Sequence, residues 1–279
     1  MQYAPIIGIS RHRILRDGQG VTTLVGFKGC MLQCAYCINK ELLMPDSPYR
    51  MLTPAQLMDI VKIDDIYFRS TNGGITFGGG EPLFHSSFIA EFKRLCHPQW
   101  KINIETSLNV NRPIVYDILG FADSLIVDVK TLNKDIYQRY TGKGNNLLFA
   151  NLKYISELHL QQKIEVRLPL IPGYNDREDV DKSMTILKAM GFSNLNIIQY
   201  LEDRESTIYG RRNRQATKYG KYVCNILKHI RKIVADANGI SIHEDICPMT
   251  VCKSGTCTKC ERMLSFISSE LNKLSEQII

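Results

Sequence analysis

The sequence predicts an α/β fold of six strand–helix units followed by a small cysteine-rich extension, and three observations support this prediction. Strand-like and helix-like stretches alternate from residue 21 to about residue 200. The helix-like stretches are roughly 10–15 residues long, which suits crossovers between parallel strands. Six units are too few for a closed eight-unit barrel, which needs ~250 residues. The six strand–helix units are therefore compatible with either a doubly wound sheet or an incomplete barrel.

Local signals in the sequence define the individual units. Residues 21–27 form a β-rich run, and the second strand ends in the glycines at 78–80. Thr53 is a plausible N-cap, with Pro54 at the first helical position. The expected strands are 21–27, 75–77, 101–106, 124–129, 163–171 and 195–200. The expected helices are 54–68, 86–96, 113–120, 146–158 and 179–190.

The character of the chain changes after residue 200. Residues 202–222 are polar and basic, and a helix is expected over 216–237, stopped by Asn238 and Gly239. A further strand over 240–243 and a terminal helix over 261–274 follow. We therefore expect a core over 1–200 and an extension over 201–279.

Composition excludes several classes of protein. The chain has 279 residues, 44% of them hydrophobic and 23% charged, as in folded domains rather than disordered chains. Its apolar runs fall short of the ~20 residues of a membrane helix, and its first residues do not resemble a signal peptide. A cytoplasmic protein is expected. The net charge of +7 suits an acidic partner, but no arginine-rich block indicates nucleic acid.

The cysteines carry the strongest chemical signal. There are nine, an odd number, and a cytoplasmic chain is not expected to hold structural disulfides. Cys96 and Cys224 stand alone, whereas the other seven form two tight groups that look like metal ligands. The first group is Cys30, Cys34 and Cys37, and the second is Cys247, Cys252, Cys257 and Cys260.

The first group has the spacing CxxxCxxC. A structural zinc site usually takes four ligands from two pairs, and no second pair lies nearby. Three thiolates from one loop suit three irons of a [4Fe–4S] cluster and leave the fourth iron open for another ligand. Tyr36, before the third cysteine, could shield such a cluster. The alternative is incidental cysteines or a structural zinc.

These residues resemble the signature of the radical S-adenosylmethionine (SAM) superfamily. The stretches Asp17–Gly20, Phe27–Cys30 and Cys37–Asn39 are similar to the activating enzymes of glycyl-radical enzymes, although Thr22 and Gly26 depart from their pattern. The resemblance covers residues 8–200. It implies a partial (β/α)6 TIM-like barrel, SAM on the open iron, and reductive cleavage of SAM to a 5′-deoxyadenosyl radical that takes hydrogen from a substrate. A flavodoxin- or ferredoxin-type electron donor is implied as well.

The resemblance also implies a SAM pocket at the carboxyl ends of the strands. Glu81 of the Gly-Gly-Glu turn would accept hydrogen bonds from the methionyl ammonium. Glu105 and Asp128 would help to hold the carboxylate end, partly through a monovalent cation, and Arg167 would bind a carboxylate with two donors. The residues expected at this pocket are Tyr36, Gly79, Gly80, Glu81, Glu105, Thr106, Asp128, Lys130, Arg167, Ile198 and Tyr200.

The second cysteine group leaves two interpretations. It could hold an auxiliary [4Fe–4S] cluster or a zinc ion, because four thiolates within fourteen residues suit both. Cys224 could donate a hydrogen atom in catalysis, complete a ligand set, or pack in the core.

Two polypeptide substrates compete, and a non-enzyme alternative remains. The core resembles activating enzymes that act on a glycine of a partner enzyme. A C-terminal cluster is instead typical of enzymes that epimerise, cross-link or cleave ribosomal peptides. The non-enzyme alternative is an iron–sulfur or zinc scaffold that binds a partner.

Overall fold

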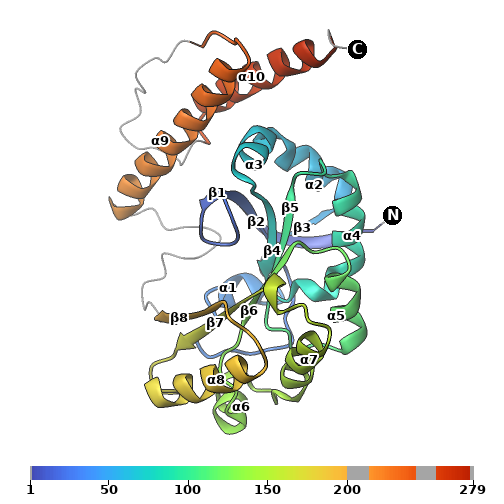
Figure 1. The fold of residues 1–279 in the computed structure, drawn as a ribbon, viewed down its shortest axis with the longest axis vertical. Coiled ribbons are helices and arrows are strands. Elements are labelled where there is room, and N and C mark those ends of the chain that lie inside the picture. The colour runs from blue at the N-terminus through green and yellow to red at the C-terminus, as the bar shows by residue number, and fades with distance from the viewer. Residues whose placement is uncertain (1, 200–213, 243–255, 277–279) are drawn as a thin grey trace.

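A curved sheet of eight strands organises the fold, which was obtained as a computed structural model describing residues 2–199, 214–242 and 256–276 (Figure 1). The strand order is β3-β1-β2-β4-β5-β6-β7-β8, and the six strands from β2 to β8 run parallel. The strands are β1 (Ala4–Ile14), β2 (Val21–Phe27), β3 (Arg50–Leu52), β4 (Gly74–Gly79), β5 (Lys101–Thr106), β6 (Ser124–Asp128), β7 (Ile164–Leu170) and β8 (Leu195–Gln199). All six predicted parallel strands are therefore confirmed.

The crossover helices decide between the two architectures. In sequence order, α2 packs against α4, α4 against α5, and α5 against α7, so successive helices are neighbours on the outer face of the sheet (Figure 1). The sheet ends at β3 and β8 without closing. This arrangement is a partial TIM-like barrel. The α-helices are α1 (Lys40–Leu43), α2 (Pro54–Val61), α3 (Asp65–Thr71), α4 (Ser86–Leu95), α5 (Arg112–Leu119), α6 (Lys134–Thr141), α7 (Asn146–Glu157), α8 (Arg177–Ala189), α9 (Arg214–Ala237) and α10 (Thr258–Glu276).

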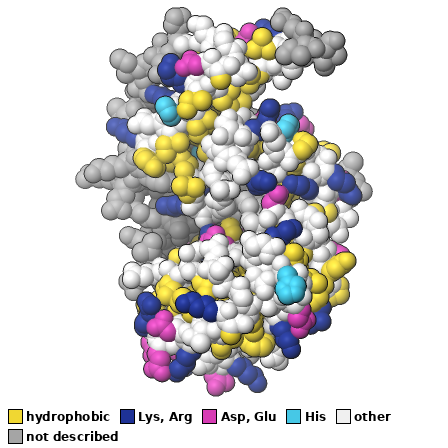
Figure 2. Space-filling view, viewed as in Figure 1, with side chains coloured by type: hydrophobic (Ala, Val, Ile, Leu, Met, Phe, Trp, Pro, Cys, Tyr) yellow, Lys and Arg dark blue, Asp and Glu magenta, His cyan; other side chains and the backbone are white. Residues whose placement is uncertain are grey.

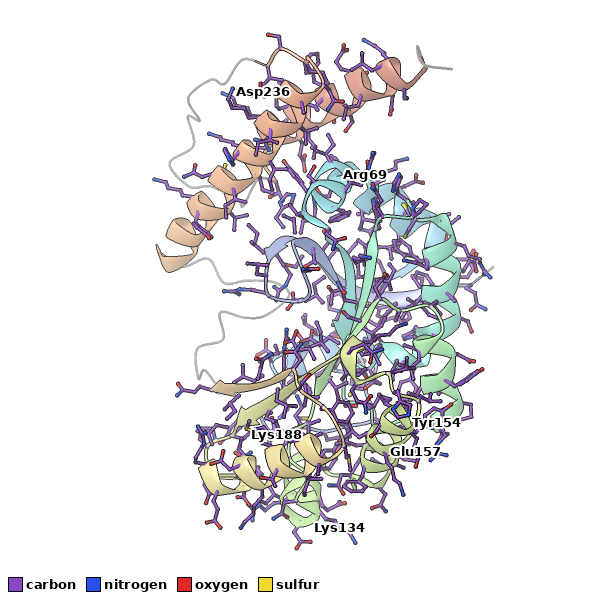
Figure 3. The ribbon with its side chains drawn as sticks, in the orientation of Figure 1. Arg69, Lys134, Tyr154, Glu157, Lys188 and Asp236 are labelled. Carbon is purple, nitrogen blue, oxygen red and sulfur yellow. The ribbon has the colours of Figure 1, made fainter. Side chains whose placement is uncertain are left out.

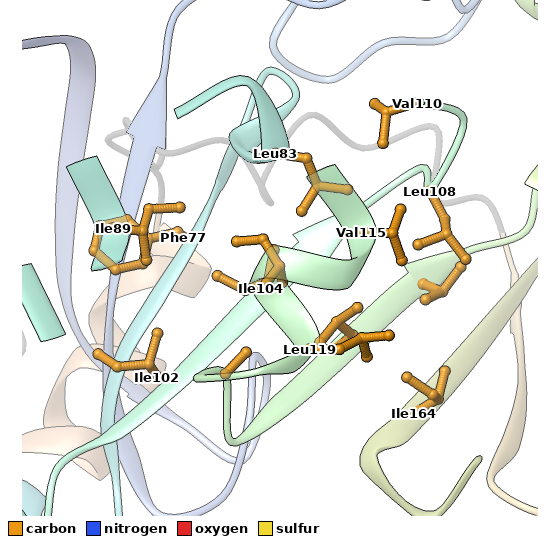
Figure 4. Close-up of a cluster of buried hydrophobic side chains, with 14 of the residues drawn as sticks. Phe77, Leu83, Ile89, Ile102, Ile104, Leu108, Val110, Val115, Leu119 and Ile164 are labelled. Carbon is orange, nitrogen blue, oxygen red and sulfur yellow. The ribbon is translucent and has the colours of Figure 1, made fainter. Parts of the chain in front are cut away.

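Capping and apolar burial explain the helix positions. Thr53 caps α2 in a capping box with Gln56, and Asp176 caps α8 in the same way with Asp179. The helices cover a core of strand residues such as Phe77 of β4, which is fully buried (Figure 4). Figure 4 shows residues of β5, α5 and β7 in the same buried cluster.

Two predicted elements differ in the structure, and two strands were not predicted. The helix expected over 54–68 is interrupted by a 3₁₀ turn over Lys62–Asp64, which places the Asp64 carboxylate beside Arg11 and His12. Residues 240–242 are not a strand, because Ile240 closes the end of α9 with its N–H on the Ala235 carbonyl and buries its side chain. The antiparallel strands β1 and β3 extend the sheet beyond the six predicted strands.

The two long helices of the extension pack against the barrel rather than standing apart. Val223 and Leu227 of α9 and Leu264 of α10 share one buried cluster with Val21 of β2 and Tyr67 of α3. None of the helices in the described ranges is long and apolar enough to cross a membrane. On the face drawn in Figure 2, lysine and arginine side chains are spread among acidic and apolar ones.

Candidate active site

The cysteine loop follows β2 directly and is fixed by backbone hydrogen bonds to α6. Gln33 N–H donates to the Thr141 carbonyl at 2.8 Å, and Ala35 N–H donates to the Tyr140 carbonyl at 3.0 Å. Cys30, Cys34 and Cys37 are each partly exposed on this loop. The loop thus places three thiols at the carboxyl end of the parallel strands, where such folds place their chemistry.

The Gly-Gly-Glu turn after β4 holds the start of this loop. Gly80 N–H donates to the Phe27 carbonyl and Glu81 N–H to the Gly29 carbonyl, both at 2.8 Å. A Cβ atom on Gly80 would lie 2.0 Å from the Gly29 oxygen, and Gly79 has a φ of +89°. Both positions therefore require glycine, because a side chain would push the turn away from the cysteine loop.

Glu81 lies almost fully buried behind this turn. Its carboxylate accepts hydrogen bonds from the hydroxyls of Thr106 and Ser107, each at 2.6 Å, and from the Ser107 and Leu83 N–H groups at 3.0 and 3.3 Å. Burial raises the pKa of Glu81, and these hydrogen bonds oppose the shift. The described chain thus already supplies four donors to Glu81, and its expected bond to a methionyl ammonium stays a prediction.

A group of five charged residues lies across β5, β6 and β7. Arg167 Nη1 lies 3.2 Å from Glu105 Oε1, and Lys130 Nζ lies 2.7 Å from Asp128 Oδ2. Asp128 and Arg167 are partners in the β6–β7 register. Burial and the nearby Asp128 raise the pKa of Glu105, against the effect of Arg167. Arg167 Nε also lies 2.8 Å from Glu165 Oε1. The group thus combines two cations with three carboxylates, and such a mixture of charges suits a zwitterionic ligand such as the amino-acid end of SAM.

The three thiols of the cysteine loop lie in a partly desolvated environment. Burial raises the pKa of Cys30 to about 12 and raises the pKa of Cys34 and Cys37 as well, so metal must replace protons there. No three His, Cys, Asp or Glu residues in the described ranges are spaced to hold a single metal ion.

Two buried polar atoms lack a hydrogen-bond partner in the described chain. They are Asn39 Oδ1, beside the loop, and the Tyr137 hydroxyl on α6. Burial raises the pKa of Tyr137, and Cys34 and Lys130 are the charged groups that affect it most, so both lie near its hydroxyl. Unpaired buried polar atoms are rare. A ligand beside the cysteines would supply the missing partners.

Sequence reasoning missed α6 and its contribution to the site. Tyr140 packs edge-on against Tyr174 with ring centroids 5.0 Å apart, and Tyr36 packs on Tyr174 at 5.8 Å. Tyr36, expected to shield a cluster, is thus held in an aromatic group beside the loop, with 40% of its surface exposed. The available signal was the spacing of Tyr137 and Tyr140, one helical turn apart after the N-cap Asn133.

The remaining expected site residues lie elsewhere or outside the described residues. Ile198 is 40% exposed on the edge strand β8. Tyr200, Cys247 and Cys252 lie outside the described ranges, as does the basic stretch through residue 213. Cys224, Cys257 and Cys260 pack together on α9 and at the start of α10. They are therefore on the extension and not at the cysteine loop.

Comparison with known proteins identifies the family. The model of the radical SAM superfamily matches residues 24–185, more than half of the chain. The chain belongs to the radical SAM superfamily. The matched range includes the cysteine loop, the Gly-Gly-Glu turn and the charged group over β5–β7.

Curated relatives of this radical SAM protein are named as activating enzymes. The pyruvate formate-lyase 1-activating enzyme of Escherichia coli K12 is 27% identical over 58% of this chain and 66% of its own length. The pyruvate formate-lyase-activating enzyme of Clostridium pasteurianum is 30% identical over 62% of this chain and 72% of its own. The chain thus spans slightly less than two thirds of the E. coli enzyme.

A solved structure supports the fold. Streptococcus suis SuiB, in its structure bound to the precursor peptide SuiA, superposes with a TM-score of 0.50 and 15% identity. The superposition covers 77% of this chain and 46% of the SuiB chain.

Proposed function

We propose that this protein is a radical SAM enzyme that cleaves SAM at a [4Fe–4S] cluster and takes a hydrogen atom from a polypeptide, as a glycyl-radical-enzyme activating enzyme. The observation that carries the proposal is the cysteine loop, whose three thiols lie at the strand ends beside the Gly-Gly-Glu turn. The similarity to activating enzymes over the core supports a glycine of a large partner enzyme as the substrate.

The chain would hold the cofactors with residues of two kinds. A bound cluster would supply the electron that splits SAM into methionine and a 5′-deoxyadenosyl radical. Cys30, Cys34 and Cys37 would ligate three irons as thiolates. Lys130 and Arg167 would orient the carboxylate of SAM, with Glu105 and Asp128 fixing the two cations in place. A monovalent cation beside these carboxylates belongs to the same proposal, as do contacts from Gly79, Gly80, Thr106, Ile198 and Tyr200.

Equilibrium binding of SAM to the anaerobically reconstituted protein tests the pocket. Replacing Arg167 with alanine should weaken binding about 10- to 150-fold, because losing a hydrogen bond to a charged group costs ~1.5–3 kcal/mol. Glu81→Ala should weaken it too, by releasing the Ser107 segment. The control is Arg177→Ala, since Arg177 is exposed on α8. Unchanged affinity in both pocket variants, with iron content intact, would reject this pocket.

A second candidate function is the modification of a ribosomally made peptide by epimerisation, cross-linking or cleavage. The cysteine-rich extension favours it, and we propose that Cys247, Cys252, Cys257 and Cys260 hold an auxiliary [4Fe–4S] cluster. The neighbouring genes discriminate between the two candidates. A glycyl-radical enzyme gene beside this one supports activation, and a short precursor peptide gene supports peptide modification.

The electron donor is proposed from chemistry alone. A flavodoxin- or ferredoxin-type protein is the natural one-electron source for such a cluster. The net charge of +7 on this chain suits an acidic donor. Cleavage driven by such a donor should weaken as salt rises, because the encounter is electrostatic.

A further inference from the structure

The turn between β1 and β2, residues 15–20, packs against the inner face of the sheet, opposite the face that the helices cover. The hydroxyl of Thr76 on β4 donates to the Asp17 carbonyl. Gly18 has a φ of +117°, and a Cβ atom there would lie 2.4 Å from the side-chain nitrogen of Asn103 on β5. Because Asp17, Thr76 and Asn103 are each no more than 3% exposed, the middle of the turn is a buried part of the barrel interior.

The turn lies beside the charged group of the candidate active site. Asn103 and Glu105 are two residues apart on β5, so their side chains point to the same face of the sheet. Arg167 Nη2 donates to the Arg16 carbonyl at 2.5 Å. Its Nε and Nη1 lie 2.8 and 3.2 Å from carboxylate oxygens of Glu165 and Glu105. A backbone carbonyl of the turn is therefore one of the three acceptors in the described chain that fix the Arg167 guanidinium.

Arg13 of β1 neutralises the buried carboxylate of the turn. Its Nε and Nη2 both donate to the Asp17 carboxylate, the Nη2 at 3.1 Å. Burial raises the pKa of Glu105, and Arg13 is among the cations that lower it, so the charge of Arg13 also reaches the charged group. A buried carboxylate needs a cationic partner. Without Arg13, Asp17 would have to take up a proton or turn toward another cation, and either change would move the adjacent Arg16 carbonyl.

We propose that Arg13 is a positioning residue for SAM binding, because by holding Asp17 it fixes the turn whose backbone holds Arg167. The inference rests on the proposed function, in which Arg167 orients the carboxylate of SAM. It deepens that function by giving a role in SAM binding to a residue that acts only through Arg167. Loss of Arg13 should therefore change SAM affinity only while Arg167 is present.

Arg11, on the same strand, provides a matched control. The side chains of Arg11 and Arg13 are each 15% exposed. Arg11 pairs with the buried carboxylate of Asp64 at 2.7 Å, so both arginines neutralise an aspartate in the interior. Arg11 also pairs with Glu261 of α10, and neither of its two partners belongs to the charged group.

The partners of this control lie away from the charged group. Asp64 directly precedes α3 and Glu261 lies in α10, and Figure 3 labels Arg69 of α3 toward one end of the molecule. Lys134 of α6, which follows Lys130 of the charged group in the chain, is labelled toward the other end. Loss of the control pair should therefore cost stability without reaching the SAM pocket.

Equilibrium binding of SAM to the anaerobically reconstituted protein, with the melting temperature measured alongside, tests the proposal. Arg13→Met and Arg11→Met should both lower the melting temperature, because each leaves a buried aspartate unpaired. Only Arg13→Met should weaken SAM binding, by about tenfold or more, and Arg13→Lys should restore part of the affinity. Equal SAM affinity in Arg13→Met and Arg11→Met would overturn the proposal.

A double-mutant cycle separates this inference from the proposed function on which it rests. In the Arg167→Ala background, Arg13→Met should cause no further loss of SAM affinity, because the turn then has no guanidinium to fix. An additive loss there would overturn the positioning role and leave the pocket assignment intact. If Arg167→Ala alone leaves SAM affinity unchanged, the pocket assignment is wrong and the inference fails with it.

Hydrogen exchange of the wild-type chain covers the case in which the Arg13 variants do not fold. Saturating SAM should slow the exchange of amides in residues 15–20, because a carboxylate bound to Arg167 keeps the guanidinium on the Arg16 carbonyl. Exchange in α10 is the internal reference and should not change. If residues 15–20 exchange at the same rate with and without SAM, the turn is not coupled to the pocket and the proposal is overturned.

Discussion

The hydroxyl of Tyr137 is buried, lies near Cys34 and has no hydrogen-bond partner in the described chain. If the cluster binds there, this hydroxyl can donate to a cluster sulfur and stabilise the more negative, reduced state. Tyr137→Phe should therefore lower the midpoint potential by about 60–130 mV, which corresponds to ~1.5–3 kcal/mol for one electron. Redox titration followed by electron paramagnetic resonance measures it.

Tyr116→Phe is the control for this prediction, because Tyr116 on α5 is 63% exposed. Both variants should bind the same amount of iron. A potential in Tyr137→Phe equal to that of the control would show that the hydroxyl does not reach the cluster.

Gly80 provides a second prediction about a single residue. A Cβ atom there would lie 2.0 Å from the Gly29 carbonyl oxygen, and backbone cannot move aside as a flexible side chain can. Gly80→Ala should therefore displace the start of the cysteine loop and reduce the iron that the loop retains. Gly144→Ala is the matched control, since its nearest neighbour would lie 3.9 Å away. Equal iron content in the two variants would refute the role given to the turn.

At the scale of elements, one buried carboxylate joins β1, the 3₁₀ turn and α10. Asp64 accepts hydrogen bonds from Arg11 at 2.7 Å and from His12 at 2.9 Å, and Arg11 also pairs with Glu261 of α10 at 2.6 Å. Burial raises the pKa of Asp64, but these partners lower it by more than burial raises it. The pKa of Asp64 is therefore below its ordinary value. Because removing one member of a buried ion pair leaves the other unpaired, Asp64→Asn should destabilise the fold by about 3–5 kcal/mol.

The lowered pKa of Asp64 predicts that the stability of the fold depends on pH. An aspartate whose folded pKa lies below its unfolded pKa of ~3.9 contributes stability that is present in full above that value. The contribution is lost as the pH falls through the lower, folded pKa. The free energy of unfolding, measured with urea between pH 7 and pH 3, should fall more steeply with decreasing pH in wild type than in Asp64→Asn. Asp59→Asn, at an exposed site on α2, should match wild type, and equal slopes in all three would contradict the prediction.

Sequence patterns predicted the parallel strands well and the remaining elements less well. Apolar runs such as residues 124–129 are readable because parallel strands are buried on both faces. Strand β1 carries the polar residues Arg11 and His12 among its apolar ones, and their partners come from distant elements, so its local pattern is weak. Thr53, Pro54 and Gln56 predict the start of α2. Its end, before the 3₁₀ turn that contains Asp64, depends on the tertiary contact of that carboxylate with Arg11.

The candidate site, like the fold, could be predicted from the sequence only in part. The three cysteines and the Gly-Gly-Glu turn are contiguous motifs, so spacing alone indicated them. The bonds of Glu81 to Thr106 and Ser107 join two strands and depend on the register of the sheet. The meeting of Cys224 with Cys260 depends on how α9 packs against α10.

For the whole molecule, the two cysteine sites lie at opposite ends of β2, which separates their expected roles. Replacing Cys257 and Cys260 with serine should leave uncoupled SAM cleavage intact, because the cysteine loop is elsewhere. The same change should lower the melting temperature and loosen α9 and α10, seen as faster hydrogen exchange in those helices. If the variant with Cys257 and Cys260 replaced stays folded but no longer cleaves SAM, the two sites are coupled and the prediction is wrong.

The central claim is that the loop carrying Cys30, Cys34 and Cys37 is the site of SAM cleavage. The most direct measurement is the amount of 5′-deoxyadenosine formed by anaerobically reconstituted, chemically reduced protein, in wild type and in the variant with all three cysteines changed to alanine. The account predicts product from wild type and none from the triple variant, which should still keep the metal of its second centre. Formation of 5′-deoxyadenosine by the triple variant would contradict the account.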